Sequence, residues 1–120
     1  MPILELTESN FKETIENNDT VIVDFWAPWC APCRNFAPVY EQVADNHEDV
    51  VFAKVNTEDQ QNLAGVFQIR SIPTLMVFRL QTPIFAQPGA LPAPALESLV
   101  TESKTVDQAA LDEAQEAANA

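Results

Sequence analysis

Short runs of apolar residues alternate along the chain with stretches in which apolar residues recur every three or four positions. The runs have the length and β-branched content of strands, and the periodic stretches are typical of helices with one buried face. The predicted strands lie at residues 3–6, 21–26, 50–55, 74–78 and 84–86. The predicted helices lie at residues 7–17, 32–47 and 57 to about 65, and after the proline-rich segment 91–94.

This order of elements predicts an α/β fold, because three strand–helix pairs are followed by two strands and a last helix. Residues 21–26 are almost continuously apolar, which suits a parallel strand covered on both faces. The crossover to residues 50–55 is long enough for a right-handed parallel connection. The strand at 84–86 lies between Pro83 and Pro88, which favours a sheet edge. We therefore expect a mixed sheet of four to five strands with helices on both faces.

Local signals predict where the helices begin and bend. Thr7 is suited to cap the first helix, which would run to about Asn17. The sequence Thr-Glu-Asp-Gln at 57–60 has the form of a capping box that opens the third helix. Pro38 lies inside the second helix, so we expect a kink there.

The charge of the chain narrows the choice of partners. Its 18 acidic and 6 basic residues give a net charge of −12, which argues against nucleic acid or an anionic membrane surface as the main partner. No apolar run is long enough to span a bilayer. The start, Met-Pro-Ile-Leu-Glu, lacks the basic residues and apolar core of a secretory signal, so we expect a cytoplasmic protein.

The end of the chain changes character. Residues 101–120 hold five acidic residues, one lysine and six alanines, and no aromatic residue. Helix propensity is high there, but Val106 and Leu111 are the only large apolar side chains available for docking. We therefore divide the chain into a domain at 1–103 and an acidic, alanine-rich tail at 104–120 that is helical or frayed.

The candidate chemistry is concentrated in the sequence Cys-Ala-Pro-Cys at 30–33. These cysteines follow a predicted strand and open a predicted helix, where free N–H groups and the helix dipole stabilise negative charge. Such a position lowers the pKa of a thiol, which makes Cys30 the expected nucleophile. Cys33, one turn further in, is placed to attack a mixed disulfide on Cys30. Pro32 fixes the backbone between them.

Two other interpretations of the cysteine pair stay open. Both residues could simply be small core side chains. They could also supply half of a tetrahedral metal site, but His47 is the only histidine, so the other ligands would have to come from a second chain. Two cysteines are too few for a disulfide-stapled scaffold, and a reducing cytosol disfavours a purely structural disulfide.

Asp24 is an acidic residue inside an apolar strand. A carboxyl group buried there has a raised pKa, and it becomes a candidate proton donor and acceptor for a neighbouring thiol. The alternative is an aspartate on an exposed strand face. Lys54 lies in the next apolar strand and could supply a counter-charge to the same pocket, or could be a lysine that reaches solvent along an apolar surface.

These motifs together resemble the thioredoxin family over about residues 3–103. The sequence VDFWAPWCAPC at 23–33 is similar to the active-site segment of that family, and Pro38 falls where the family kinks its active-site helix. Further similarities are found in the third strand, in the loop that carries the family's cis-proline, and at the glycine after the last strand: FAKVN at 52–56, IRSIPT at 69–74, and Gly89.

The resemblance implies a role for each matching residue. Cys30 attacks the target disulfide and Cys33 resolves the mixed disulfide. Asp24, directly or through a water, handles the proton of Cys33, and Lys54 modulates Asp24. Trp26 packs under the dithiol and, with Pro38, supports the site.

The resemblance also implies a client-binding surface beside the dithiol, formed by Trp29, Ala31, Pro32, Ile72, Pro73 and Gly89. Ile72 would offer backbone hydrogen bonds to an extended client segment. Pro73, cis in the family, has no N–H to interfere with the sulfur chemistry. Gly89 would permit close approach of the chain.

The chain departs from the common family pattern at a few positions. Ala31 stands where glycine is commonest, and Ser71 stands where glycine is frequent. The turn at 79–83 lacks the usual Asn-Gly type of sequence, so its geometry is open.

As a function, the resemblance implies a cytoplasmic thiol–disulfide oxidoreductase that reduces disulfides in client proteins. Its electrons would come from a flavoprotein thioredoxin reductase, and the chain itself would hold no cofactor and no metal. We expect it to act as a monomer that binds neither nucleic acid nor membrane. The alternative is a thioredoxin-like chaperone or adaptor module, with the tail as a linker. Such modules often lose one cysteine, and this chain keeps both.

Overall fold

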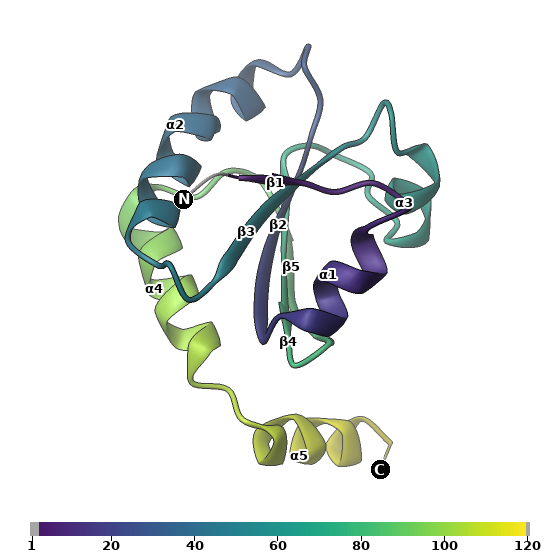
Figure 1. The fold of residues 1–120 in the computed structure, drawn as a ribbon, viewed down its shortest axis with the longest axis vertical. Helices are drawn as coiled ribbons and strands as arrows, with labels where there is room; N and C mark the ends of the chain where they lie inside the picture. Colours follow the sequence, from purple (N-terminus) through teal and green to yellow (C-terminus); the bar gives the residue numbers. More distant parts are fainter. Residues whose placement is uncertain (1–2, 120) are drawn as a thin grey trace.

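A five-stranded mixed sheet with helices on both faces forms the centre of the molecule (Figure 1). The computed structural model describes residues 3–119. The strands are β1 (Leu4–Glu5), β2 (Thr20–Trp26), β3 (Val51–Asn56), β4 (Thr74–Arg79) and β5 (Thr82–Pro88). The helices are α1 (Phe11–Asn17), α2 (Ala31–Asp45), α3 (Gln61–Val66), α4 (Ala93–Lys104) and α5 (Gln108–Asn119).

The sheet has the order β1-β3-β2-β4-β5. β3 is parallel to both β1 and β2, whereas β4 is antiparallel to β2 and β5 is antiparallel to β4. The predicted mixed sheet, the parallel pairing of the second and third strands, and the edge position of the fifth are therefore confirmed. The β2–β3 register places Asp24 opposite Lys54, at the centre of the sheet.

Alternate residues of the central strands point to two separate cores, because successive side chains of a strand face opposite sides. On one side Ile22, Phe52 and Val77 pack under α2 and α4. On the other side Val23 and Phe25 belong to a cluster that reaches α1 and the end of α3. This two-sided burial explains why the strands read as continuous apolar runs.

Two predicted helix starts are wrong, because the polar side chains concerned have other partners. α1 begins at Phe11 and not after Thr7, whose hydroxyl lies 2.8 Å from the Ser9 hydroxyl in the preceding turn. α3 begins at Gln61, and the hydroxyl of Thr57 donates to the carbonyl of Trp26 at 3.1 Å. The predicted capping box therefore does not form.

The C-terminal segment folds into α5, which lies beyond the end of α4 (Figure 1). Leu111 is 9% exposed, so this helix does bury its one leucine. The guanidinium of Arg79 donates through Nε to the carbonyl of Val106 at 2.7 Å and through Nη1 to the hydroxyl of Thr20 at 2.8 Å. The tail therefore docks more firmly on the domain than the sequence led us to expect. Met1, Pro2 and Ala120, which the predicted domain and tail include, lie outside the described residues.

Candidate active site

The two cysteines lie where β2 passes into α2. Cys30 is the N-cap residue of α2, and a proline is accommodated in the first turn, where N–H groups lack intrahelical partners. The Sγ atom of Cys30 accepts a hydrogen bond from the backbone N–H of Cys33 at 3.2 Å. The predicted placement at a helix start is confirmed, and it puts the Cys30 sulfur at the positive end of the helix dipole.

Cys30 and Cys33 are joined by a disulfide, with their Cα atoms 5.3 Å apart. This Cα separation lies within the usual range for disulfides. Cys30 is 5% exposed and Cys33 is 2% exposed, so the bond lies just beneath the surface with Cys30 the outer residue. The structure therefore holds the site in its oxidised state.

The loop before β4 lies against the outer cysteine. The Ile72–Pro73 peptide bond is cis, and the Sγ atom of Cys30 lies 3.8 Å from the carbonyl oxygen of Ile72. No S–H is available to donate in the disulfide, so this contact becomes a possible hydrogen bond only when Cys30 is a thiol. The resemblance placed these residues together, and the fold brings them together.

Gly89 is held next to this loop by a hydrogen bond from its N–H to the carbonyl of Pro73 at 2.8 Å. Its φ of +100° is a conformation that glycine adopts much more readily than other residues. A Cβ atom built on Gly89 would meet no atom within 4 Å. The chain therefore does approach the site loop at Gly89, but the feature that favours glycine in the structure is the backbone conformation and not a lack of room for a side chain.

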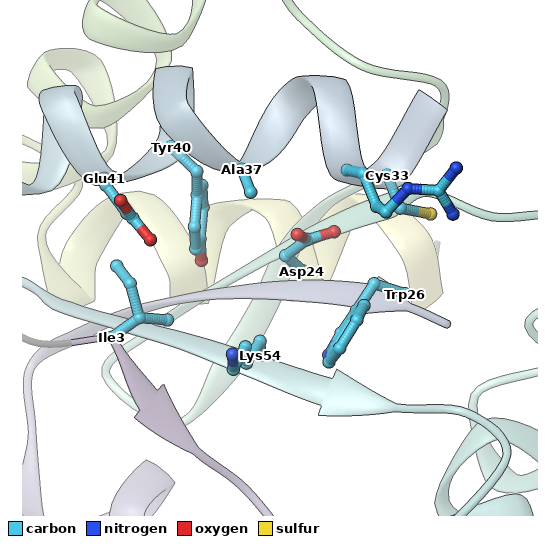
Figure 2. A pocket seen from close by; sticks show the side chains of 9 residues that line it. Ile3, Asp24, Trp26, Cys33, Ala37, Tyr40, Glu41 and Lys54 are labelled. Carbon is cyan, nitrogen blue, oxygen red and sulfur yellow. The ribbon is translucent and has the colours of Figure 1, made fainter. Parts of the chain in front are cut away.

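Asp24 lies beneath the dithiol in a cavity of about 100 Å³ that Cys33 also lines (Figure 2). It is 5% exposed, and its Oδ1 atom makes no hydrogen bond within residues 3–119. Burial raises the pKa of Asp24 to about 7, against the opposing effect of the Lys54 charge. The expectation of a buried carboxyl with a raised pKa is confirmed.

Lys54 lines the same cavity, opposite Asp24 in the β2–β3 ladder. Its Nζ atom lies over the indole ring of Trp26, 5.0 Å from the ring centroid. No carboxylate oxygen of the described residues comes within 4.0 Å of this Nζ. The charge of Lys54 thus lowers the pKa of Asp24 through the electrostatic field, without a direct ion pair.

The other predicted residues lie around the dithiol in different degrees of exposure. Trp29 is 64% exposed, and Ala31 and Pro32 are exposed at the start of α2. Ile72 is half-buried. Pro38 lies further along α2, is exposed, and does not line the cavity.

The sequence analysis missed three residues of the site, which are Glu58, Arg34 and Tyr40. The Trp29 indole N–H donates to the carboxylate of Glu58, and Arg34 donates through Nη1 to the carbonyl of Pro28 at 2.8 Å. Tyr40 was read only as an apolar helix position. Its buried hydroxyl lies 2.7 Å from the carbonyl oxygen of Ala53 on β3 and 3.0 Å from that of Ile22 on β2. The sequence did contain a signal for this contact, because a tyrosine on the buried face of a helix usually needs a hydrogen-bond partner for its hydroxyl group.

Within residues 3–119, no group of three or more histidine, cysteine or acidic side chains is arranged to hold a metal ion. His47 is engaged elsewhere, because its Nε2 atom lies 2.6 Å from the carboxylate of Glu97 on α4. Over the same described residues, no helix has the length and apolarity needed to cross a membrane.

A mixed sheet with a Cys-x-x-Cys disulfide at the N-terminus of the helix after β2 defines a thiol–disulfide oxidoreductase. The thioredoxin family model matches residues 2–102, and the chain belongs to the thioredoxin family. It is a thioredoxin-type protein disulfide oxidoreductase that exchanges its dithiol with disulfides of other proteins.

Named relatives and solved structures agree with this assignment. A putative thioredoxin 2 of Streptomyces coelicolor is 51% identical over 104 residues, covering 87% of this chain and 78% of the relative. The thioredoxin of Porphyra purpurea is 41% identical, covering 85% and 97%. Among structures, a chloroplastic thioredoxin z superposes with a TM-score of 0.81 at 26% identity, over 88% of this chain and 97% of that one. The oxidised thioredoxin of Plasmodium falciparum gives 0.76 at 31% identity, covering 84% and 97%.

Proposed function

We propose that this thioredoxin-family protein reduces client disulfides in the cytoplasm, with Cys30 as the attacking thiol and Cys33 as the resolving thiol. The observation that carries this assignment is the Cys30–Cys33 disulfide at the start of α2, with Cys30 as the outer residue. The nearby Asp24 supplies a proton acceptor to the inner residue.

The exchange takes place in two steps that together move two electrons. The thiolate of Cys30 attacks one sulfur of the client disulfide, so that a mixed disulfide forms and the other client sulfur leaves as a thiolate. The thiolate of Cys33 then attacks the Sγ atom of Cys30, which breaks the mixed disulfide and releases the second client sulfur. The client is reduced to a dithiol, and the protein is oxidised to the disulfide seen in the structure.

Asp24 takes the proton of Cys33 in the second step, directly or through a water. A group that must accept a proton near neutral pH works best with a pKa near that pH. The pKa of Asp24 is raised to about 7 by burial, and its carboxyl group shares a cavity with Cys33. Lys54 modulates this pKa through its charge.

The client lies across the surface beside the disulfide. Trp29 is exposed there, held by Glu58, and the Ile72–Pro73 turn presents backbone groups next to the Cys30 sulfur. An extended client segment can add to this turn as a short strand. Pro32 and Gly89 flank the same surface.

After each turnover a flavoprotein thioredoxin reductase returns two electrons to the Cys30–Cys33 disulfide. The protein acts as a monomer and carries no cofactor of its own. A cytoplasmic location fits this cycle, because a dithiol that must be regenerated needs a compartment in which reductant is supplied.

A reductase-coupled assay with insulin as the client tests this proposal. With the reductase present, the wild-type protein should couple oxidation of NADPH by the reductase to reduction and precipitation of the insulin chains, and Cys30→Ser should abolish turnover. Asp24→Asn should slow turnover about tenfold or more near pH 7, with a loss of the pH dependence that Asp24 provides. An inactive wild type that nevertheless suppresses aggregation of unfolded clients would show a chaperone or adaptor instead.

A further inference from the structure

The ammonium group of Lys54 has two possible partners on β2, and it contacts only one of them. Asp24 is its register partner across the β2–β3 ladder, and Trp26 is two residues further on the same face. The Nζ atom lies 5.0 Å from the centroid of the Trp26 ring, whereas no carboxylate oxygen of residues 3–119 lies within 4.0 Å of it. The contact that the Lys54 ammonium makes is therefore with the indole and not with the carboxylate.

The surroundings of Asp24 leave Lys54 as its principal counter-charge. From α2, the buried Cys33 and Tyr40 and the exposed Arg34 and Glu41 line the cavity. The Tyr40 hydroxyl is directed to backbone carbonyls, and Arg34 donates to the carbonyl of Pro28.

The neighbours of Asp24 on the other sides are apolar. β4 places Leu75 opposite Asp24, and Ile3 closes the side of the cavity near β1. Burial raises the pKa of Asp24, and the charge of Lys54 opposes that effect.

We propose that Trp26 is a positioning residue, whose indole face keeps the Lys54 ammonium in the cavity and thereby sets the influence of Lys54 on Asp24. A lysine side chain has four rotatable bonds and ordinarily extends its charged end into water. An aromatic face at this distance attracts a cation, most strongly when the contact is partly desolvated, and both side chains here are half-buried. Without the indole, Lys54 turns to solvent and its charge is screened from Asp24.

The importance of this inference for catalysis rests on the proposed role of Asp24, but the geometry can be tested without it. The measurement is the pKa of Asp24, followed by NMR of its carboxyl carbon in the full-length oxidised protein. Four proteins form a cycle: the wild type, Lys54→Met, Trp26→Leu and the double variant.

In the wild-type background, Lys54→Met should raise the pKa of Asp24, because a nearby positive charge is removed. In the Trp26→Leu background the rise in the pKa of Asp24 caused by Lys54→Met should be smaller, by about half a pKa unit or more. A change in the burial of Asp24 alone shifts both members of the pair alike and leaves the Lys54 effect unchanged. Water admitted to the cavity would also weaken the Lys54 effect by screening it, so the chemical shifts of the Lys54 methylene protons, described below, distinguish screening from loss of the indole contact. Equal effects of Lys54→Met in the two backgrounds would therefore overturn the proposal.

Two further measurements test the proposal if Trp26→Leu does not fold. Trp26→Phe retains a smaller aromatic face and should give an effect of Lys54→Met between those of the other two backgrounds. In the unsubstituted protein, the methylene protons next to the Lys54 nitrogen should resonate upfield of ordinary lysines because of the indole ring current. Ordinary shifts there would contradict the proposal, while normal turnover of Asp24→Asn would count only against the proton-transfer role of Asp24.

Discussion

The backbone N–H of Cys33 points at the sulfur of Cys30 across 3.2 Å, within the first turn of α2. In the dithiol state the same N–H group and the end of the helix stabilise a thiolate on Cys30. Cys33 has no such advantage, because it lies further inside the helix and is 2% exposed.

This asymmetry predicts selective alkylation of the reduced protein. With limiting iodoacetamide near pH 7, Cys30 should react on the order of tenfold faster than Cys33, as measured by mass spectrometry of tryptic peptides. The Cys30→Ser variant, which retains only Cys33, serves as the control and should react slowly. Comparable labelling of both residues would show that the helix end does not activate Cys30.

Asp24 should make the protein less stable as the pH rises. Its folded pKa of about 7 lies well above the ordinary aspartate value of 3.8, which the unfolded chain retains. Below about pH 4 the carboxyl group is protonated in both states and has no effect on stability. Between about pH 4 and 7 the unfolded chain releases this proton while the folded protein keeps it, so stability falls. Above pH 7 the loss stays constant at about 4 kcal/mol.

Asp24→Asn should therefore stabilise the protein by a few kcal/mol more at pH 8 than at pH 4. Urea unfolding at the two pH values measures the difference. Glu13→Gln, which changes an exposed carboxyl group on α1, is the matched control and should show little pH-dependent gain. An equal gain from Asp24→Asn at both pH values would mean that the pKa of Asp24 is not raised in the folded protein.

Tyr40 should stabilise the pairing of β2 with β3 through its hydroxyl group. That group can donate to one or both of the carbonyls of Ile22 and Ala53, which belong to adjacent strands. Tyr40→Phe keeps the ring contacts with Phe36 and Phe52 but removes the hydrogen bond, and should cost about 1–2 kcal/mol in the free energy of unfolding. Urea unfolding with an unchanged m-value would measure this cost, and no loss of stability would show that the bond is neutral.

The C-terminal helix should contribute to stability without taking part in thiol exchange. Leu111→Ala should cost about 1–2 kcal/mol, below the usual range for core leucines because the site is peripheral. Glu113→Ala, on the exposed part of α5, is the matched control and should be neutral. Insulin reduction should be unchanged in both variants at a temperature where they are folded. A loss of exchange activity in folded Leu111→Ala protein would link α5 to the site.

The sequence predicted the fold and the buried acid because both depend on neighbouring residues. Asp24 is flanked by Val23 and Phe25, so its burial could be inferred from the strand alone. The proline-bracketed edge strand could be inferred in the same way. The helix starts at Thr7 and Thr57 were predicted wrongly, because each hydroxyl found a partner other than the helix N–H groups.

The contacts that the sequence did not predict join residues from distant elements. Glu58 approaches Trp29, and Tyr40 approaches Ile22 and Ala53, only after β2, β3 and α2 have packed together. The same holds for Lys54 on the Trp26 ring, since only the β2–β3 register places them together. The contribution of Leu111 to docking was underestimated, because it is buried beside β5, which the sequence of the tail alone does not reveal.

The proposed division of work between the two cysteines is tested most directly by trapping the mixed disulfide. Reduced Cys33→Ser, mixed with a disulfide-containing client such as insulin, should accumulate a covalent complex. Peptide mass spectrometry should place the bond on Cys30. Reduced Cys30→Ser, treated identically, should form little complex. A complex that forms through Cys33 at a comparable rate, or the absence of any complex with Cys33→Ser, would contradict the assignment of Cys30 as the nucleophile.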